Sequence, residues 1–487
     1  MDIFLLLSLF LSSIFVFYTF FRGSKTKPNL KSSTSLPPGS RGWPFLGETL
    51  DYFDKLWRGV PEKFEHERNG GEKNPTGIFK TSLLGEHMAI LCGAEGNKFL
   101  FSNEHKLVQL WWPNSINKIF PQSNDEFMKE DAPKTRKIIL RFLRQEALQE
   151  YIPIIDEVTR NHMKMDWNRD EVKVAPAMSK YTFTLACRMF LSIRDEERVE
   201  ELRKSFRDVS LGAISMAINL PGTTFNRAIK ASKVMRKEIE KMVMERMNET
   251  NRTSEELNRD LLSYMIEGNE LYDNFMTASD IASVMLGVFY AGTHTLNVGL
   301  VFVTLYLAEL PHVYNEVLKE QLEIAKSKKE GELLTLDDLK KMKYSMNVVN
   351  EALRIMPPSL GMFREAITDF TYNGYLVPKG WKLHVITHST HKNPKYFPNP
   401  EKFDPSRFEG NGPAPFTFFP FGGGPRVCPG SEYARQITLV FVHNLVTRFK
   451  IEKQIPDEKI VIDPTPRPVE GLPIRLHPHK QSHNISN

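Results

Sequence analysis

The chain has 487 residues and a hydrophobic fraction of 41%, which is enough for a large buried core in one large domain or several smaller ones. The formal net charge is +5, and no basic run is interleaved with aromatic residues, so the composition does not support nucleic-acid binding. Three cysteines without a Cys-x-x-Cys pair argue against a disulfide framework and a zinc ribbon.

The first segment, residues 3–21, is uncharged and apolar, and basic residues follow it between positions 22 and 31. A helix of this length nearly spans a bilayer core of about 30 Å, and adjacent positive charge tends to stay cytoplasmic. A cleaved signal peptide is the alternative, but no basic segment precedes the run and no small-residue cleavage site closes it. We therefore expect residues 1–22 to form an uncleaved transmembrane helix.

Residues 23–47 are basic at first and then rich in proline, with the run Leu-Pro-Pro-Gly at positions 36–39. Adjacent prolines stiffen the chain and exclude a helix. We interpret this stretch as a hinge between the anchor and a globular domain over residues 48–487. An ordinary loop is the alternative.

Patterns in the globular part predict a mainly α fold with small β-sheets. Gly85 separates two apolar runs within residues 76–91, which predicts a hairpin. The Asn373-Gly374 pair predicts a second tight turn between strands. Helical periodicity marks residues 137–151, 196–207, 228–248, 278–310 and 344–354.

The most distinctive stretch surrounds Cys428. Glycine lets backbone approach closely where a side chain would block it, and Pro429 suits the first turn of a following helix. The positive end of that helix would favour a thiolate on Cys428. A lone cysteine is more often a small buried hydrophobe, so the argument depends on the combined pattern Phe421-Gly422-Gly423-Gly424-Pro425-Arg426-Val427-Cys428-Pro429-Gly430.

This pattern, Phe-x-x-Gly-x-Arg-x-Cys-x-Gly, resembles the haem-binding loop of the cytochrome P450 superfamily. The resemblance implies the cytochrome P450 fold, haem b as the cofactor and Cys428 as the axial ligand of its iron. In that family the thiolate pushes electron density toward O–O cleavage. It further implies that Phe421, Gly424, Arg426 and Gly430 contribute to the cofactor site, with Arg426 on a haem propionate.

Two other segments match the same family in order and spacing. Glu351 and Arg354 lie on one helical face because they are three residues apart, and an exposed ion pair of little energetic weight is one interpretation. Residues 405–408 resemble the Pro-x-Arg-Phe segment of the family. The resemblance implies that Glu351, Arg354 and Arg407 form a buried network that locks the region carrying Cys428.

Several basic residues match family positions near the haem propionates. Arg364 follows a double proline, and arginine meets carboxylates bidentately. Arg136 and Lys134 lie where the family often has a propionate-binding residue, although the usual tryptophan is absent there. His391 matches another such position, but a lone histidine is more often structural.

Residues 291–295 read Ala-Gly-Thr-His-Thr within the apolar helix expected over 278–310. A core helix with a permissive glycine is one interpretation. The family pattern is Ala/Gly-Gly-x-Asp/Glu-Thr-Thr/Ser, in which an acid and an alcohol relay protons to oxygen. Thr295 keeps the alcohol, whereas His294 replaces the acid and Leu296 replaces the second alcohol. Because histidine shuttles protons near neutral pH, we expect Thr295 and His294 to form an altered relay.

A narrower similarity connects the chain with the plant triterpenoid-oxidising branch, which includes beta-amyrin oxidases. It implies a monooxygenase that oxidises a lipophilic polycyclic terpenoid, with a triterpenoid favoured, using O2 and electrons from NADPH. The segments that carry this similarity are residues 111–113, 339–345, 363–366, 378–382, 408–415 and 472–476.

The chain shows no dinucleotide fingerprint and no P-loop, so electrons from NADPH must arrive through a partner protein. The resemblance implies NADPH-cytochrome P450 reductase as that partner. It also implies membrane lipid around the anchor and a single-pass location in the endoplasmic reticulum membrane, with the catalytic domain facing the cytosol. Two alternatives remain open: a haem-thiolate isomerase or dehydratase that needs no reductase, and a non-catalytic haem- or sterol-binding protein.

Overall fold

The computed structural model describes residues 35–43, 47–58, 61–68, 76–121, 127, 130–213, 215–248, 260–463 and 465–479. The predicted anchor over residues 1–22 lies outside the described residues, and so does the first part of the predicted hinge.

Small sheets accompany the helices, as the sequence predicts. Within the described residues the strands are β1 (Ile78–Leu83), β2 (Glu86–Leu91), β3 (Val108–Leu110), β4 (Glu171–Lys173), β5 (Gly361–Ala366), β6 (Phe370–Tyr372), β7 (Tyr375–Val377), β8 (Lys382–Ile386), β9 (Phe449–Lys453), β10 (Ile460–Ile462), β11 (Pro466–Pro468) and β12 (Pro473–Pro478).

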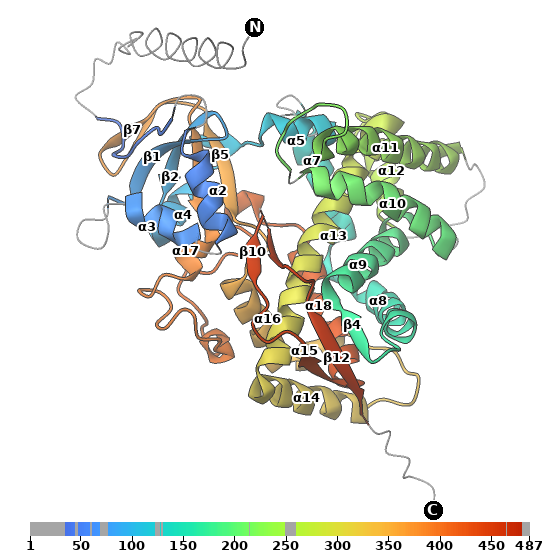
Figure 1. Cartoon of the computed structure of the whole chain (residues 1–487). Coiled ribbons are helices and arrows are strands. Elements are labelled where there is room, and N and C mark those ends of the chain that lie inside the picture. Colours follow the sequence, from blue (N-terminus) through green and yellow to red (C-terminus); the bar gives the residue numbers. More distant parts are fainter. Residues whose placement is uncertain are drawn as a thin grey trace, which may run out of the picture.

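The largest sheet has the strand order β1-β2-β8-β5-β3 and lies at one side of the molecule (Figure 1). β1 and β2 form the hairpin predicted around Gly85. β8 runs parallel to β2 and antiparallel to β5. Strands from late in the chain therefore extend the early β1–β2 hairpin into a larger sheet. The predicted turn at Asn373-Gly374 joins β6 to β7, and both residues have positive φ.

The rest of the described chain is mainly helical. Its helices are α2 (Thr49–Trp57), α3 (Pro61–Arg68), α4 (Gly93–Ser102), α5 (Asn114–Ile119), α7 (Ala132–Phe142), α8 (Gln145–Asp166), α9 (Val174–Leu191), α10 (Glu196–Ala213), α11 (Thr224–Asn248), α12 (Leu261–Leu271), α13 (Ala278–Glu309), α14 (Pro311–Lys326), α15 (Leu336–Lys341), α16 (Lys343–Ile355), α17 (Thr387–His391) and α18 (Ser431–Val446), with short 3-10 helices η2 (Pro405–Phe408) and η3 (Gly424–Arg426).

α13 runs through the middle of the helical region (Figure 1) and packs against α9, α11, α16 and α18. Thr277 and Asp280 begin it with a reciprocal capping box. Among the described residues it is the one helix long and apolar enough to cross a membrane. However, 56% of its most apolar 18-residue stretch is buried inside the protein. α13 is therefore the central helix of the core.

The single helix predicted over residues 137–151 is wrong. α7 ends at Phe142 and α8 begins at Gln145, because Arg144 adopts an extended backbone with φ −66° and ψ 150°. Ile138 and Leu148 are both fully buried in the same core. The apolar periodicity therefore continues across a turn that carries no glycine or proline.

The end of the predicted hinge is packed on the sheet. The backbone N–H of Lys80 donates to Pro38 O at 2.7 Å, and its Nζ donates to Pro37 O at 2.8 Å. Gly39 also forms a parallel bridge with Lys80. Residues 37–39 are therefore fixed against β1.

Candidate functional site

Cys428 lies in the loop between η3 and α18. Its backbone N–H donates to Phe421 O at 2.8 Å, which closes the loop. Gly424 has φ +65°, and a Cβ there would lie 2.4 Å from the carbonyl oxygen of Phe101, so a larger residue would be excluded. α18 begins at Ser431, after Pro429, so the prediction that Pro429 lies in its first turn is wrong.

Opposing effects act on the Cys428 thiol. Burial raises its pKa above the usual value, whereas the Gly430 N–H and the charges of Arg136 and Arg435 lower it. Arg136 also fixes the loop, because its Nη2 donates to Val427 O at 2.6 Å. The net effect is a pKa above the usual value, so the Gly430 N–H and the two cations offset burial only in part. The thiolate form that a metal ligand requires would therefore depend on the positive charge of a bound iron.

Lys134, the other basic residue considered on α7, points elsewhere. Its Nζ lies 4.8 Å from the centre of the Phe275 ring and 3.9 Å from a carboxylate oxygen of Asp131. Of these two residues, only Arg136 contacts the cysteine loop through a hydrogen bond.

Glu351, Arg354 and Arg407 come together in the structure. Arg354 donates from Nε and Nη2 to the Glu351 carboxylate at 2.7 and 2.8 Å, and both side chains are fully buried. Arg407 Nε lies 3.4 Å from Glu351 Oε1. The N–H of Asp404 also donates to Glu351, which connects α16 to the segment before η2. The exposed-pair interpretation is therefore wrong.

His391 belongs to this network. Its Nδ1 lies 3.2 Å from Arg354 O, and its Nε2 accepts the backbone N–H of Phe419 at 3.0 Å. Because Nε2 accepts, the proton resides on Nδ1, which donates to Arg354 O. Burial and the charge of Arg354 lower the pKa of His391 to about 3, so the ring is neutral. Both ring nitrogens are engaged, and the propionate role considered for His391 has no support.

Arg364 and Arg426 meet at a carboxylate that the sequence analysis did not identify. Arg364 Nε donates to Glu104 Oε2 at 2.5 Å, and Arg426 Nε lies 3.5 Å from Glu104 Oε1. Glu104 lies 260 positions before Arg364, so no local pattern could have revealed the contact. The two arginines predicted to hold propionates therefore share one buried carboxylate.

His294 and Thr295 have different surroundings on α13. The His294 ring stacks on Tyr290 at 5.3 Å and 9°, and its Nε2 lies 3.2 Å from Thr465 Oγ1 in the turn between β10 and β11. Burial lowers the pKa of His294 to about 4, so it is neutral at pH 7. Thr295 is exposed, and its hydroxyl donates to Ala291 O at 2.7 Å. Such bonds to the preceding turn often bend a helix.

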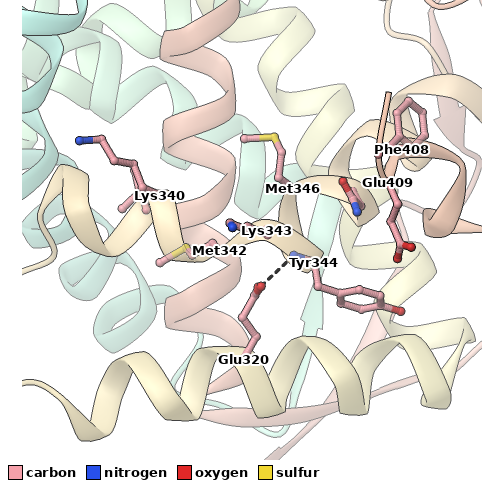
Figure 2. Close-up of a pocket in the computed structure, with 11 residues that line it drawn as sticks. Glu320, Lys340, Met342, Lys343, Tyr344, Met346, Phe408 and Glu409 are labelled. Atoms are coloured by element: carbon pink, nitrogen blue, oxygen red, sulfur yellow. Dashed lines mark hydrogen bonds between the residues drawn. The ribbon is translucent and has the colours of Figure 1, made fainter. Parts of the chain in front are cut away.

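A surface pocket lies between α14, α15, α16 and residues 408–410 (Figure 2). On its α14 side, Glu320 accepts the N–H groups of Tyr344 at 2.7 Å and Ser345 at 3.0 Å. This carboxylate caps α16, the helix that carries Glu351 and Arg354. The pocket lining thus supports the buried network from outside and contains none of the predicted site residues.

Comparison with known proteins identifies the class. The cytochrome P450 family model matches residues 37–478. Beta-amyrin 28-monooxygenase of Saponaria officinalis is 52% identical over 452 residues, covering 93% of each chain. Beta-amyrin 16-beta-monooxygenase of Platycodon grandiflorus is 52% identical over 460 residues, covering 93% of this chain and 95% of the relative. The structure of retinoic acid-bound cyanobacterial CYP120A1 matches with a TM-score of 0.82 and 30% identity, covering 92% of this chain and all of that one.

This chain therefore belongs to the cytochrome P450 family, and it is a haem-dependent monooxygenase. The described residues fit that cofactor. The cysteine loop leaves no room for a Cβ at Gly424, and the buried Nε of Arg426 lacks a hydrogen-bond partner among the described residues. A thiol ligand and buried guanidinium groups are the chemistry that a haem iron and its carboxylates require.

Proposed function

We propose that this chain uses haem b to oxidise a lipophilic polycyclic triterpenoid, with O2 and electrons from NADPH. The observation that carries the substrate class is the identity of 50% or more, over nearly the whole chain, to relatives named beta-amyrin monooxygenases. Those relatives are named for oxidation at different carbons, 28 and 16-beta, so the proposal covers the scaffold and leaves the position to experiment.

Each site residue has a distinct proposed role. Cys428 ligates the haem iron, and the bound haem supplies the O2 activation that C–H oxidation requires. Arg364, Arg426 and Arg136 pair with the haem propionates. Phe421, Gly424 and Gly430 shape the loop around the ligand.

The remaining residues act on structure and on protons. The buried network of Glu351, Arg354 and Arg407 holds the segment before the cysteine loop, as its hydrogen bonds support. The Thr295 hydroxyl moves protons at the reacting centre. His294 is neutral and hydrogen-bonded to Thr465. It assists by accepting and then donating one proton, and it carries no permanent charge as the family acid does.

The proposal includes membrane attachment. Residues 1–22 anchor the protein in the endoplasmic reticulum membrane, residues 23–47 connect the anchor, and residues 48–487 form the catalytic domain on the cytosolic side. NADPH-cytochrome P450 reductase supplies the electrons, because the chain has no nucleotide motif of its own. The apolar run at residues 3–21 supports the anchor.

The test is a product screen. The full chain is expressed in microsomes with a plant reductase, supplied with triterpene, diterpene and sterol scaffolds, and analysed by mass spectrometry. We expect an NADPH-dependent product from a triterpene, heavier by one oxygen atom. An NADPH-independent isomer or dehydrated product would support the isomerase alternative. A substrate-induced spectral change without product would support the non-catalytic alternative.

A further inference from the structure

Glu104 is held inside the protein by a tight turn after α4. Asn103 O accepts the N–H groups of Leu107 and Val108, and His105 adopts a left-handed backbone with φ +62°. The turn leads directly into β3, which pairs with β5, the strand that carries Arg364. As a result the Glu104 side chain is 1% exposed, which is unusual for a carboxylate and requires charged partners.

Glu104 meets both of its partners through the same edge of their guanidinium groups. Arg364 uses Nε at 2.5 Å, and Arg426 presents Nε at 3.5 Å. The carboxylate thereby bridges β5 and η3, two segments that are far apart in the sequence. The guanidinium group is planar, and its Nε and terminal nitrogens point from different edges of that plane. Arg426 therefore keeps its Nη atoms for further acceptors, and Arg364 keeps Nη2, because its Nη1 donates to Phe363 O at 2.8 Å.

The charges around Glu104 do not balance within the protein. One carboxylate faces two guanidinium groups, and the Glu104 Oε1 and Arg426 Nε atoms are buried without a hydrogen-bond partner among the described residues. Arg136 adds a third cation nearby, since burial and the charge of Arg426 both lower its pKa. Because buried positive charge without a partner is unfavourable, additional negative charge would stabilise this cluster.

We propose that Glu104 is a positioning residue that holds Arg364 and Arg426 by their Nε edges for the two carboxylates of the haem. The three arginines carry three positive charges. Glu104 and the two haem propionates together carry three negative charges, so the local charges balance. This inference rests on the proposed function, because it assumes a haem at Cys428. The negative charge of Glu104 also favours ferric over ferrous iron.

The test uses full-length holoenzyme and the isosteric substitution Glu104→Gln, which removes the charge and keeps the shape. Glu365→Gln is the matched control, because Glu365 lies next to Arg364 on β5 and forms an ion pair with Lys382 at 3.2 Å. Two properties are measured: the rate of haem transfer from the ferric protein to apomyoglobin, and the midpoint potential of the iron.

We expect Glu104→Gln to lose haem about tenfold faster than wild type, since tenfold corresponds to 1.4 kcal/mol and losing a buried charged partner typically costs more. We also expect its midpoint potential to be more positive, whereas Glu365→Gln should leave both values near wild type. If the substitution only loosened the fold, it would not specifically predict a more positive midpoint potential. Haem loss and potential equal to wild type would overturn the proposal.

If Glu104→Gln fails to accumulate, Glu104→Asp keeps the charge but shortens the side chain by one methylene. We then expect faster haem loss with little change in potential, and unchanged haem loss would overturn the proposal. Wild-type protein that binds no haem would instead overturn the proposed function itself. Wild-type activity together with an unaffected Glu104→Gln would overturn only the role of Glu104.

Discussion

The imidazole of His294 lies parallel to the ring of Tyr290, and its Nε2 lies 3.2 Å from the hydroxyl of Thr465. This pair of contacts ties the middle of α13 to the turn between β10 and β11. The residue that replaces the family acid is therefore part of a fixed structure, and its neutral ring has one nitrogen already engaged.

The first prediction concerns this contact. Thr465→Val keeps the size of the side chain and removes a hydrogen bond worth about 1 kcal/mol. His294 then samples other orientations, so we expect less product per NADPH consumed while NADPH consumption continues. We expect His294→Asp to change the same ratio, because it places a negative charge beside Tyr290. Ratios equal to wild type in both variants would remove position 294 from the proton relay.

The second prediction concerns the buried ion pair. Glu351→Ala leaves Arg354 charged and unpaired inside the protein, at a cost of about 3–5 kcal/mol. We expect little haem-loaded protein, measured as the thiolate-type carbon monoxide difference spectrum per milligram. The matched control is Glu200→Ala on α10, where Glu200 forms a partly exposed pair with Arg203 at the same three-residue spacing. That pair should contribute only about 0.2–1 kcal/mol, and equal haem content in the two variants would contradict the account.

The third prediction separates backbone strain from close contact. Gly424 and Gly412 have nearly the same φ, +65° and +63°. A Cβ at Gly424 would meet the Phe101 carbonyl at 2.4 Å, whereas a Cβ at Gly412 would meet nothing within 4 Å. Both alanine variants incur about 1–2 kcal/mol of left-handed strain, but Gly424→Ala should lose a further 1–3 kcal/mol, roughly, from overpacking.

Thermal unfolding of the two glycine variants measures this difference. We expect a lower midpoint and a lower haem content for Gly424→Ala than for Gly412→Ala. Equal midpoints would show that the loop can move away from Phe101, and would remove the close contact as the reason for this glycine.

The fourth prediction concerns acid stability. His384 is fully buried, stacks on Phe363 at 4.2 Å and lies 3.3 Å from the Tyr52 hydroxyl. Burial lowers its pKa from 6.5 to about 4. Its neutral form is favoured by folding, so its contribution is fully present above pH 6.5 and is lost as the pH falls toward 4, by up to about 3 kcal/mol.

Urea unfolding between pH 7 and pH 4 tests this dependence. We expect the free energy of unfolding of wild type to fall across this range, and the slope to be smaller for His384→Gln, which cannot take up a proton. Identical slopes would show that His384 does not carry the predicted share of the acid sensitivity.

The sequence predicted those parts of the site that depend on short motifs. The cysteine loop and the Glu351–Arg354 spacing are local, so their residues could be named before the structure. The hairpin at Gly85 and the turn at Asn373-Gly374 were predicted for the same reason, since glycine marks them directly.

The parts that were missed depend on contacts across the fold. Glu104 reaches Arg364 from 260 positions away, and Thr465 reaches His294 from 171 positions away. His391 was considered as a propionate partner, but tertiary packing places both of its nitrogens in the backbone network. The break at Arg144 escaped prediction because the residues on both sides face the same core.

The measurement that tests the central claim most directly is isotopic. Microsomes containing the full chain and a reductase are supplied with a triterpene substrate and NADPH under 18O2, alongside Cys428→Ser as the control. The account predicts a product that carries one labelled oxygen atom from wild type and none from the variant. An unlabelled product, or a labelled product that Cys428→Ser still forms, would contradict oxygen transfer at a haem held by Cys428.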